Sequence, residues 1–414
     1  MERRDFIAFS TLSALGLFSS GAVADEKSPA PNKNVAIRGS YSNSKRVFEA
    51  EKRGTVAFLG GSITEMDGYR PMVCSDLQER FPETDFQFIA AGISSTCSDV
   101  GAFRLESDVL SQADKIDFFF VEFAVNDDQD GIFDFKRTTR GMEGIVRHML
   151  LANPNVDIVM TFFVNEHLMD VYRKGEEATS IAAHRKIAEH YGVSTINLAK
   201  EIQEQIDDGR ITWKEFGGVH PAPRGNRICA DMIAGLLDSS WSQGTADALV
   251  AHPLPEPFDP FSFFNGRWRG FSGIETNVGS IDDATLPSDG GFRLYQPDWS
   301  KIPGSFRARF GGRKLLCAER AGAEARFKFT GSALSLYILA GPDAGIVECE
   351  LDGGAPFRAN AFHHYSAGLH YPCSLLLASE LSSGEHTATI RVAPEKDANS
   401  KGTALRILEI GTND

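Results

Sequence analysis

The stretch Val56-Ala57-Phe58-Leu59-Gly60-Gly61-Ser62-Ile63-Thr64 decides the fold, because a short apolar run leads straight into two glycines and a serine. A run of this kind is typical of a strand that is buried on both faces of a parallel sheet. A serine held on a tight turn at the end of a strand can act as a nucleophile when a base takes its proton. Ser62 is therefore the candidate nucleophile.

Three further motifs follow along the chain and add two candidate oxyanion-binding residues and a candidate base. They are Ala91-Gly92-Ile93-Ser94, Ala124-Val125-Asn126-Asp127 and Gly218-Val219-His220-Pro221. Each motif is common by itself, because glycine turns and Asn-Asp turns are frequent and most histidines are structural or exposed. Their order, and their positions at the ends of strand-like runs or in a later loop, make the set far more specific.

Apolar runs alternate with helix-like stretches through the first part of the chain. The strand-like runs are residues 55–59, 86–91, 118–124, 158–164 and 193–198, and the helix-like stretches are residues 69–81, 101–112, 139–152, 179–191 and 224–237. This alternation predicts a parallel sheet with helices on both faces. In such a sheet, ligands bind at the carboxyl ends of the strands, near the point where the strand order reverses.

The four motifs resemble those of the SGNH hydrolases, a branch of the GDSL esterase/lipase group whose four blocks carry Ser, Gly, Asn and His. The first block reads Gly-Gly-Ser-Ile-Thr where the commonest family form is Gly-Asp-Ser, and the resemblance covers roughly residues 54–237. It implies a flavodoxin-like three-layer α/β fold, with Ser62 as nucleophile and His220 as base. It also implies an oxyanion hole made by the backbone N–H groups of Ser62 and Gly92 and the side-chain amide of Asn126.

One position departs from the family pattern. The family usually places an aspartate three residues before the histidine, and this position is Gly217. Three alternatives stay open: Glu215 supplies the acid; another carboxylate such as Glu65, Glu122 or Asp127 substitutes for it; or a backbone carbonyl suffices in a Ser-His dyad. Loss of the acid from an established triad lowers the rate by about 10⁴, but an enzyme that evolved as a dyad need not lose that factor.

The sequence changes character after residue 239. His252-Pro253-Leu254-Pro255-Glu256-Pro257-Phe258-Asp259-Pro260 is rich in proline and cannot hold a helix or a sheet. Beyond it, short strand-like runs broken by Gly, Asp and Ser occupy residues 325–329, 334–339, 346–351, 387–392 and 405–410. We therefore predict an α/β catalytic domain at residues 53–240, a linker at 241–262 and an all-β sandwich or jelly-roll domain at 263–414.

The first residues resemble a twin-arginine export signal. Arg3 and Arg4 precede an apolar run from Ile7 to about Gly21, and Ala22-Val23-Ala24 offers a small-x-small cleavage site. The run is too short, and too rich in Ser and Gly, to span a bilayer that needs ~20 apolar residues. We expect a signal at residues 1–24, export to the periplasm or the extracellular space, no membrane partner after cleavage, and a polar tail or loosely packed lead-in at 25–52.

Composition excludes several partners. A net charge of -14 argues against nucleic acid and anionic membranes, which favour basic surfaces, but it does not argue against neutral sugars. No cluster of metal ligands is evident, so we expect neither a metal ion nor a cofactor.

Without a Cys-x-x-Cys pair, the cysteines are expected to be mostly buried free thiols, with room for one bridge in an oxidising compartment. These six residues are Cys74, Cys97, Cys229, Cys317, Cys349 and Cys373.

Other polar residues have two interpretations each. Arg104 is placed to touch a substrate from the helix after Gly92, but a salt-bridged helix residue is more common. Asp127 and Asp128 either shape the rim of a pocket or form a solvated acidic turn. A group of histidines and tyrosines in the second domain can contact sugar faces, although ordinary loop and core packing is favoured. Its members are His363, His364, Tyr365, His370 and Tyr371.

The leading hypothesis is an exported serine esterase that removes acyl groups, chiefly acetyl, from a carbohydrate, and this substrate rests on the resemblance. A lipase, thioesterase or arylesterase of the same fold is the alternative among hydrolases. A carbohydrate-binding or scaffold protein with a degraded site is a third hypothesis, which Gly217 keeps open and the retention of Ser62, Asn126 and His220 opposes. Glycoside cleavage by paired carboxylates is a fourth, because fold does not fix function.

Overall fold

Strand β2, Arg53–Gly60, lies inside a sheet whose strands run in the order β1-β6-β5-β4-β2-β3. The other strands are β1 (Val35–Ala36), β3 (Asp85–Gly92), β4 (Phe118–Glu122), β5 (Asp157–Thr161) and β6 (Ser194–Ile196). Strands β2 to β6 pair in parallel, and β1 pairs antiparallel with β6. The chain passes from β2 to β3 on one side and then to β4 on the other, so the strand order reverses at β2. The predicted flavodoxin-like topology is confirmed, and ligands bind at such a reversal point.

The computed structural model describes residues 32–242, 244–245, 247–282 and 291–414. These residues belong to one compact unit. The export signal that we predict at residues 1–24 lies outside the described residues.

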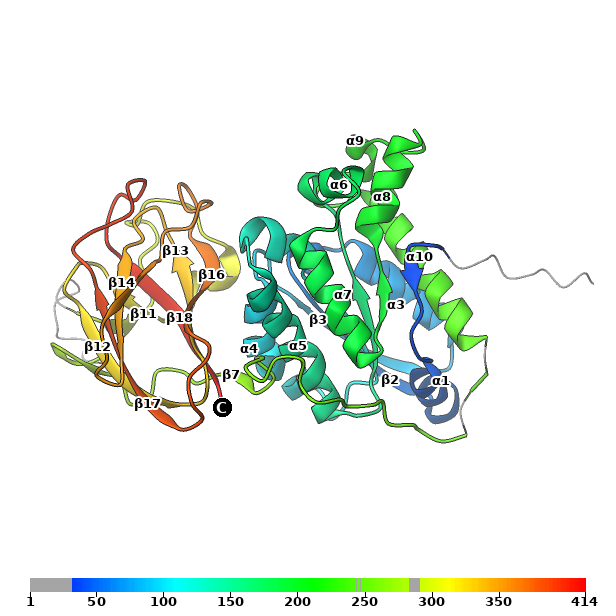
Figure 1. Ribbon diagram of the computed structural model, residues 1–414, viewed down its shortest axis with the longest axis horizontal. Coiled ribbons are helices and arrows are strands. Elements are labelled where there is room, and N and C mark those ends of the chain that lie inside the picture. The colour runs from blue at the N-terminus through cyan, green and yellow to red at the C-terminus, as the bar shows by residue number, and fades with distance from the viewer. Residues whose placement is uncertain (1–31, 243, 246, 283–290) are drawn as a thin grey trace, which may run out of the picture. The chain divides into compact units, whose positions relative to one another are not determined.

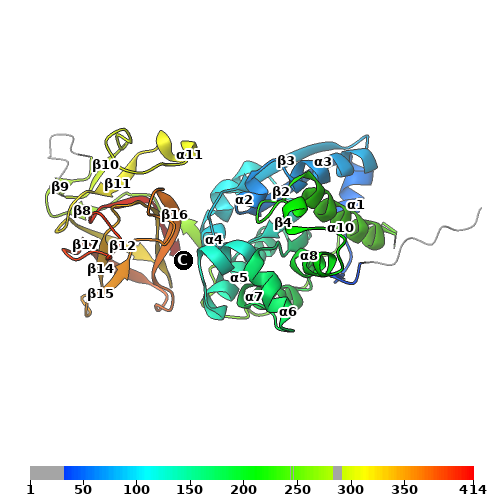
Figure 2. The same cartoon turned by 90° about the horizontal axis from the view of Figure 1, so that it is seen from above.

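Helices cover both faces of the sheet (Figure 1, Figure 2). Helices α3 (Tyr69–Arg80) and α10 (Pro223–Trp241) pack together on one face, and α4 (Ser98–Asp108), α5 (Phe135–Ala152) and α7 (Thr179–Tyr191) pack side by side on the other. The shorter helices are α1 (Ser42–Arg46), α2 (Ser62–Glu65), α6 (Glu166–Arg173), α8 (Leu198–Asp207) and α9 (Trp213–Phe216). The five predicted helices are confirmed, and α5 begins before residue 139 because Asp134 caps it by accepting a hydrogen bond from the Arg137 backbone N–H.

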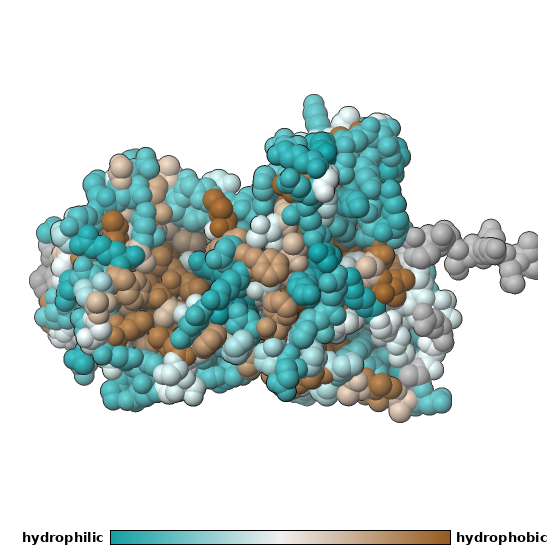
Figure 3. All heavy atoms as spheres, in the orientation of Figure 1, coloured by the Kyte–Doolittle hydropathy of each residue, from teal (hydrophilic) through white to brown (hydrophobic). Residues whose placement is uncertain are grey.

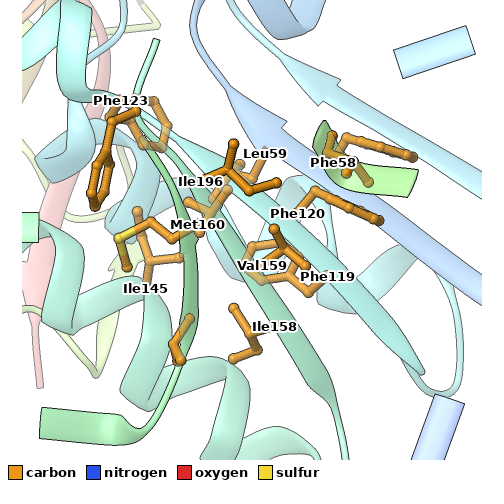
Figure 4. Close-up of a cluster of buried hydrophobic side chains, with 14 of the residues drawn as sticks. Phe58, Leu59, Phe119, Phe120, Phe123, Ile145, Ile158, Val159, Met160 and Ile196 are labelled. Atoms are coloured by element: carbon orange, nitrogen blue, oxygen red, sulfur yellow. The ribbon is translucent and has the colours of Figure 1, made fainter. Parts of the chain in front are cut away.

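The core of this sheet contains strands that are apolar on both faces. Every residue of β4 is buried, and Phe58 on β2 stacks against Phe120 on β4 with ring centres 4.8 Å apart. Figure 4 shows these rings together with Phe119, Phe123 and aliphatic side chains from the neighbouring elements. Because helices exclude water from both faces, apolar runs without alternation form strands here.

Residues 32–52 are not loosely packed, which corrects the expectation drawn from their polarity. Strand β1 lengthens the sheet, and the side chains of Tyr41, Val47 and Phe48 are buried against the α/β core. The Tyr41 hydroxyl also donates a hydrogen bond to the Ile158 carbonyl oxygen at 3.0 Å. A few buried apolar side chains therefore hold this segment against the core. The average polarity of the segment did not reveal them.

The C-terminal region, in the part that is described, is built from two antiparallel sheets. One runs β10-β11-β18-β13-β16 with β7 beside β18, and the other runs β15-β14-β17-β12-β8-β9. Side chains along β12 alternate between the core and solvent, as in a sandwich. The predicted all-β sandwich is confirmed. Its elements are β7 (Gly266–Trp268), β8 (Glu275–Thr276), β9 (Gly279–Ser280), β10 (Arg293–Tyr295), α11 (Ala308–Gly311), β11 (Leu315–Ala318), β12 (Glu324–Thr330), β13 (Leu334–Ala340), β14 (Ile346–Leu351), β15 (Phe357–Asn360), β16 (Tyr371–Ala378), β17 (Glu385–Val392) and β18 (Leu405–Asn413).

The α/β region and the C-terminal β region share buried contacts. Phe103 on α4 stacks against Phe263 and Trp268, with ring centres 5.2 and 5.6 Å apart. The proline-rich segment between the regions holds neither helix nor strand, as predicted. It is nevertheless fixed in place, because the buried Glu143 carboxylate accepts a hydrogen bond from the Asp259 backbone N–H at 2.9 Å.

All six cysteines are free thiols, and four of them are buried. Burial raises the pKa of the Cys97 and Cys229 thiols well above the usual range. These cysteines therefore behave as small apolar core residues.

The surface of the α/β region on the side of Figure 1 is mostly hydrophilic, whereas apolar residues are visible among the strands of the β region (Figure 3). A polar surface agrees with the net charge of -14. Of the helices in the described residues, none is both long enough and apolar enough to cross a membrane.

Candidate active site

Ser62 and His220 meet at the carboxyl end of β2, where the strand order reverses. Helix α2 begins at Ser62, directly after the glycines that end the strand. The Ser62 Oγ and His220 Nε2 atoms lie 2.8 Å apart, although the residues are 158 positions apart in the sequence. This is the distance at which an imidazole can take a proton from a hydroxyl during attack. His220 is exposed, so the pair opens to solvent.

The predicted oxyanion residues pack tightly against this turn. Gly60 at the end of β2 is in register with Gly92 at the end of β3. A methyl group at Gly92 would lie 2.2 Å from the backbone nitrogen of Glu65 in α2, and one at Gly61 would lie 2.1 Å from the Asn126 Oδ1 atom. A side chain at Gly92 would therefore clash with the α2 backbone, and one at Gly61 would displace the Asn126 amide, so the segments of Ser62, Gly92 and Asn126 are in direct contact.

Asn126 is buried and its side chain is held by Asp130, which the sequence analysis did not single out. The Asn126 Nδ2 group donates a hydrogen bond to the Asp130 Oδ2 atom at 2.6 Å. Burial raises the pKa of Asp130, although hydrogen bonds from Tyr371, Asn126 and Gln129 oppose that rise. A carboxyl group four residues after a candidate oxyanion amide was the available signal for this role.

Glu122 lies beneath the turn that carries Ser62. It is the last residue of β4, it is fully buried, and its Oε1 atom accepts hydrogen bonds from the Gly61 backbone N–H at 2.9 Å and the Thr64 hydroxyl at 2.7 Å. Burial raises the pKa of Glu122 to about 7, against the effect of these hydrogen bonds. Glu122 therefore fixes the backbone on both sides of Ser62.

Glu65 connects helix α2 to the loop that follows β3. Its Oε2 atom accepts hydrogen bonds from the Ser94 backbone N–H, at 2.7 Å, and from the Ser94 hydroxyl, and its Oε1 atom pairs with Arg309 of the β region. Burial acts to raise the pKa of Glu65, but the hydrogen bonds from Ser94 and the charge of Arg309 outweigh it and hold this pKa below its ordinary value. Glu65 is thus an ionised link between two segments of the site.

The structure does not place Glu215 beside His220. Glu215 forms a capping box with Thr212 at the start of α9, and its other carboxylate oxygen pairs with Arg224 at 3.1 Å. Among the described residues, no carboxylate forms a hydrogen bond with the His220 ring. The side-chain hydrogen bond of His220 there is with the Ser62 hydroxyl.

Gly217 has a backbone conformation that leaves no room for the aspartate of the family pattern. Its φ is +109°, and a methyl group there would lie 2.0 Å from the backbone nitrogen of Ala222. The loop that delivers His220 is therefore built around a glycine, and the geometry present is that of a Ser-His pair.

The remaining polar residues of the α/β region are part of the scaffold. Asp127 is buried and pairs with His184 at 2.9 Å, and Asp128 pairs with His167 at 2.9 Å. Arg104 is a salt-bridged helix residue, as favoured, and pairs with Asp108. It also donates hydrogen bonds to the carbonyl oxygens of Gly60 and Ala91 at 2.9 and 2.6 Å, so it joins the ends of β2 and β3.

The histidines and tyrosines of the β region separate into two groups. His370 is buried, and its Nε2 group donates a hydrogen bond to the Pro303 carbonyl oxygen at 3.0 Å, which is ordinary packing. His363 stacks on Tyr371 with ring centres 4.3 Å apart, and its Nε2 atom lies 2.8 Å from the Asp130 carbonyl oxygen. Together with His364 and the exposed Tyr365, it forms an aromatic cluster beside the Asn126 segment.

Comparison with solved structures extends over both regions. A two-domain esterase (CEX) active on acetylated mannans is 21% identical, with a TM-score of 0.70 over 92% of this chain and 97% of that chain. The same esterase co-crystallised with mannopentaose gives a TM-score of 0.69 over 92% and 96%. Axe2, an acetylxylan esterase from Geobacillus stearothermophilus, matches 47% of this chain and 97% of its own at 21% identity, with a TM-score of 0.36. The two CEX structures establish that this chain and the CEX esterase share a fold over both regions.

A search of curated proteins found no match. The family model that matches is the GDSL-like Lipase/Acylhydrolase family, over residues 58–228. This range begins in β2 and includes Ser62, Gly92, Asn126 and His220, which the fold brings together at the reversal point of the sheet. Residues 58–228 therefore match the model of the GDSL-like Lipase/Acylhydrolase family, and this match supports an ester-bond hydrolase of the SGNH type.

Proposed function

We propose that this chain is an exported serine esterase that removes O-acetyl groups from a carbohydrate. The observation that carries the proposal is the 2.8 Å contact between the Ser62 hydroxyl and the His220 Nε2 atom, at the point where the Gly92 and Asn126 segments pack against the same turn. A nucleophile, a base and oxyanion donors in one place are what acyl transfer needs.

The reaction follows from these positions. Ser62 Oγ attacks the ester carbonyl carbon while His220 takes the hydroxyl proton, which gives a tetrahedral oxyanion. The backbone N–H groups of Ser62 and Gly92 and the Asn126 amide stabilise this oxygen, and each donor contributes about 3–4 kcal/mol. The oxyanion then collapses, the ester C–O bond breaks, and His220 gives the proton to the leaving sugar oxygen, which departs as a hydroxyl group and leaves the acyl group on Ser62. Water, activated by His220, attacks the acyl-serine and releases acetate.

A carbohydrate substrate is supported by the neighbourhood of the site. The CEX esterase of similar two-region fold acts on acetylated mannans. In this chain, a cavity of about 250 Å³ is lined by Ser95 and Asp130 of the α/β region and by His363 and Tyr371 of the β region. Aromatic faces beside polar groups suit a sugar ring. Export agrees with a polysaccharide substrate outside the cytoplasm, and it is proposed from the first 24 residues of the sequence alone.

The test compares wild type with Ser62→Ala and Glu215→Gln on p-nitrophenyl acetate, acetylated mannan and acetylated xylan. We expect acetate release by wild type, a loss of about 10³-fold or more in Ser62→Ala, and near-wild-type rates in Glu215→Gln, because glutamine preserves the capping box. Rates that peak beyond about C6 acyl chains would indicate a lipase or thioesterase instead. If folded wild type releases no acetate beyond the Ser62→Ala level, the esterase proposal fails.

A further inference from the structure

The loop between β3 and α4 carries Gly92 and has an unusual backbone. Ser95 has a φ of +70°, in the left-handed region that residues other than glycine seldom adopt. Such a conformation is unfavourable for a residue other than glycine and persists only where surrounding groups hold it. The groups that hold this loop come largely from the C-terminal β region.

Arg309, in α11, contacts both segments that supply oxyanion donors. Its guanidinium donates a hydrogen bond to the Gly92 carbonyl oxygen at 3.2 Å and forms an ion pair with Glu65. Glu65 lies on the same four-residue helix as Ser62 and accepts the Ser94 backbone N–H through its other oxygen. One guanidinium of the β region thus bridges the helix of Ser62 and the loop of Gly92.

Further contacts from the β region support the same segments. Arg307 donates a hydrogen bond to the Ser95 hydroxyl. The Tyr371 hydroxyl interacts with both the Ser95 hydroxyl and the Asp130 carboxyl, and Asp130 holds the Asn126 amide. The strained loop is therefore held from outside the α/β region, and the Asp130 carboxyl that holds the Asn126 amide is contacted from the β region as well.

We propose that the C-terminal β region is a structural part of the active site, in which Arg309 is a positioning residue that aligns the Ser62 and Gly92 oxyanion donors through Glu65 and the Gly92 carbonyl. This inference deepens the proposed esterase function and rests on it. It predicts that the β region controls turnover of every ester, including small esters that reach no sugar-binding surface.

The test uses the full chain and compares Arg309→Met with a matched control, Arg313→Met. Arg313 lies four positions later, its side chain is 42% exposed against 39% for Arg309, and it pairs with Glu409 inside the β region. On p-nitrophenyl acetate we expect Arg309→Met to lower kcat by about 10- to 100-fold with KM within about twofold, because small displacements of oxyanion donors are costly. Arg309→Lys should recover part of the loss, and Arg313→Met should match wild type.

Hydrogen exchange provides a readout that does not depend on catalysis. We expect the Ser94 amide and residues 92–96 to exchange at least about tenfold faster in Arg309→Met than in wild type or Arg313→Met. Glu65→Gln, which removes the charged partner of Arg309, should give the same increase in hydrogen exchange at residues 92–96. It replaces Arg309→Met in the test if that variant folds poorly.

Three outcomes overturn the positioning role. If hydrogen exchange at residues 92–96 is the same in Arg309→Met as in wild type, the positioning role is wrong whatever the activity. It is also wrong if kcat falls equally in Arg309→Met and Arg313→Met. A higher KM for acetylated mannan with unchanged turnover of p-nitrophenyl acetate would assign Arg309 to glycan binding instead. If wild type and Ser62→Ala are equally inactive, the esterase proposal fails separately, and the exchange measurement still decides whether Arg309 holds the loop.

Discussion

At the scale of single residues, two buried carboxyl groups hold the segments that carry the candidate catalytic residues. Glu122 holds the Gly61 backbone and the Thr64 hydroxyl, and Asp130 holds the Asn126 amide. Both carboxyl groups are desolvated, which raises their pKa values. Desolvated groups of this kind make the stability of the fold depend on pH.

Glu122 gives a prediction about pH. Its pKa rises from 4.5 in an exposed chain to about 7 in the fold. The unfolded chain therefore loses this proton near pH 4.5, whereas the folded chain keeps it until about pH 7. The contribution of Glu122 to the free energy of unfolding is fully present below pH 4.5, and it falls by about 3 kcal/mol as the pH rises to 7. Glu122→Gln should lack this fall. Urea unfolding of both proteins at pH 4.5, 6 and 7.5 measures it, and a constant difference between the two proteins would contradict it.

Gly217 gives a second prediction at this scale. Restoring the family aspartate with Gly217→Asp should lower activity instead of raising it, because the new side chain meets the Ala222 backbone at 2.0 Å and disturbs the His220 loop. Gly217→Ala should destabilise the fold by about 2–3 kcal/mol. The neighbouring Gly218 also has a positive φ but has open space around it, so Gly218→Ala should cost only about 1 kcal/mol. Thermal unfolding and p-nitrophenyl acetate turnover compare the three variants, and equal losses at both glycines would refute the steric argument.

At the scale of elements, the short helix α2 matters most, because it carries Ser62 and lies against the end of β3. The Gly92 backbone is close enough to α2 that no side chain fits between them. A helix of four residues has little stability of its own, so its position is set by Glu122 from below and by the β3 loop from the side.

Gly92→Ala should therefore displace α2 and lower kcat by about 10²-fold, as expected when a catalytic group moves by about 1 Å. The control is Gly235→Ala in α10, where a methyl group meets nothing within 4 Å. That variant should keep full activity and gain about 0.5–1 kcal/mol of stability, because alanine favours a helix over glycine. Steady-state kinetics and urea unfolding of the two variants test this, and a fully active Gly92→Ala would show that α2 does not depend on this contact.

At the scale of the whole molecule, charged contacts join the α/β region to the linker and the β region. Arg140 on α5 is buried to 4% exposure and pairs with Asp259 of the linker at 2.8 Å and with Glu380 of the β region at 2.9 Å. Arg173, by contrast, forms exposed ion pairs within the α/β region.

Removing Arg140 should cost far more than removing Arg173. Arg140→Ala leaves the carboxylate of Asp259 without its partner, and breaking such a pair costs about 3–5 kcal/mol. Arg173→Ala should change the free energy of unfolding by less than about 1 kcal/mol. Urea unfolding of the full chain measures both, and similar small changes would show that the contact between the regions is weak.

The sequence by itself determined the α/β sheet, the sandwich and the motifs that meet at the site. Apolar runs such as the one that ends at Leu59, and the glycine turn before Ser62, are local patterns that predict strands and turns wherever they fall. The alternation of strands and helices then limits the sheet to a few topologies, and the ends of parallel strands must lie at one edge. For this reason the motifs of Ser62, Gly92 and Asn126 could be placed together without a structure.

The tertiary structure alone decided what supports these residues and how the second region takes part. Strand β16 escaped prediction because it contains Pro372, which an edge strand tolerates. The partners of Glu122, Asp130 and Glu65, and the approach of Arg309 to Gly92, join residues that are up to 244 positions apart. Such contacts depend on how packed elements bring side chains together in space. Gly217 likewise excludes an aspartate because its φ is positive and because Ala222 folds back against it. Local sequence patterns do not predict such contacts between residues that are far apart in the chain.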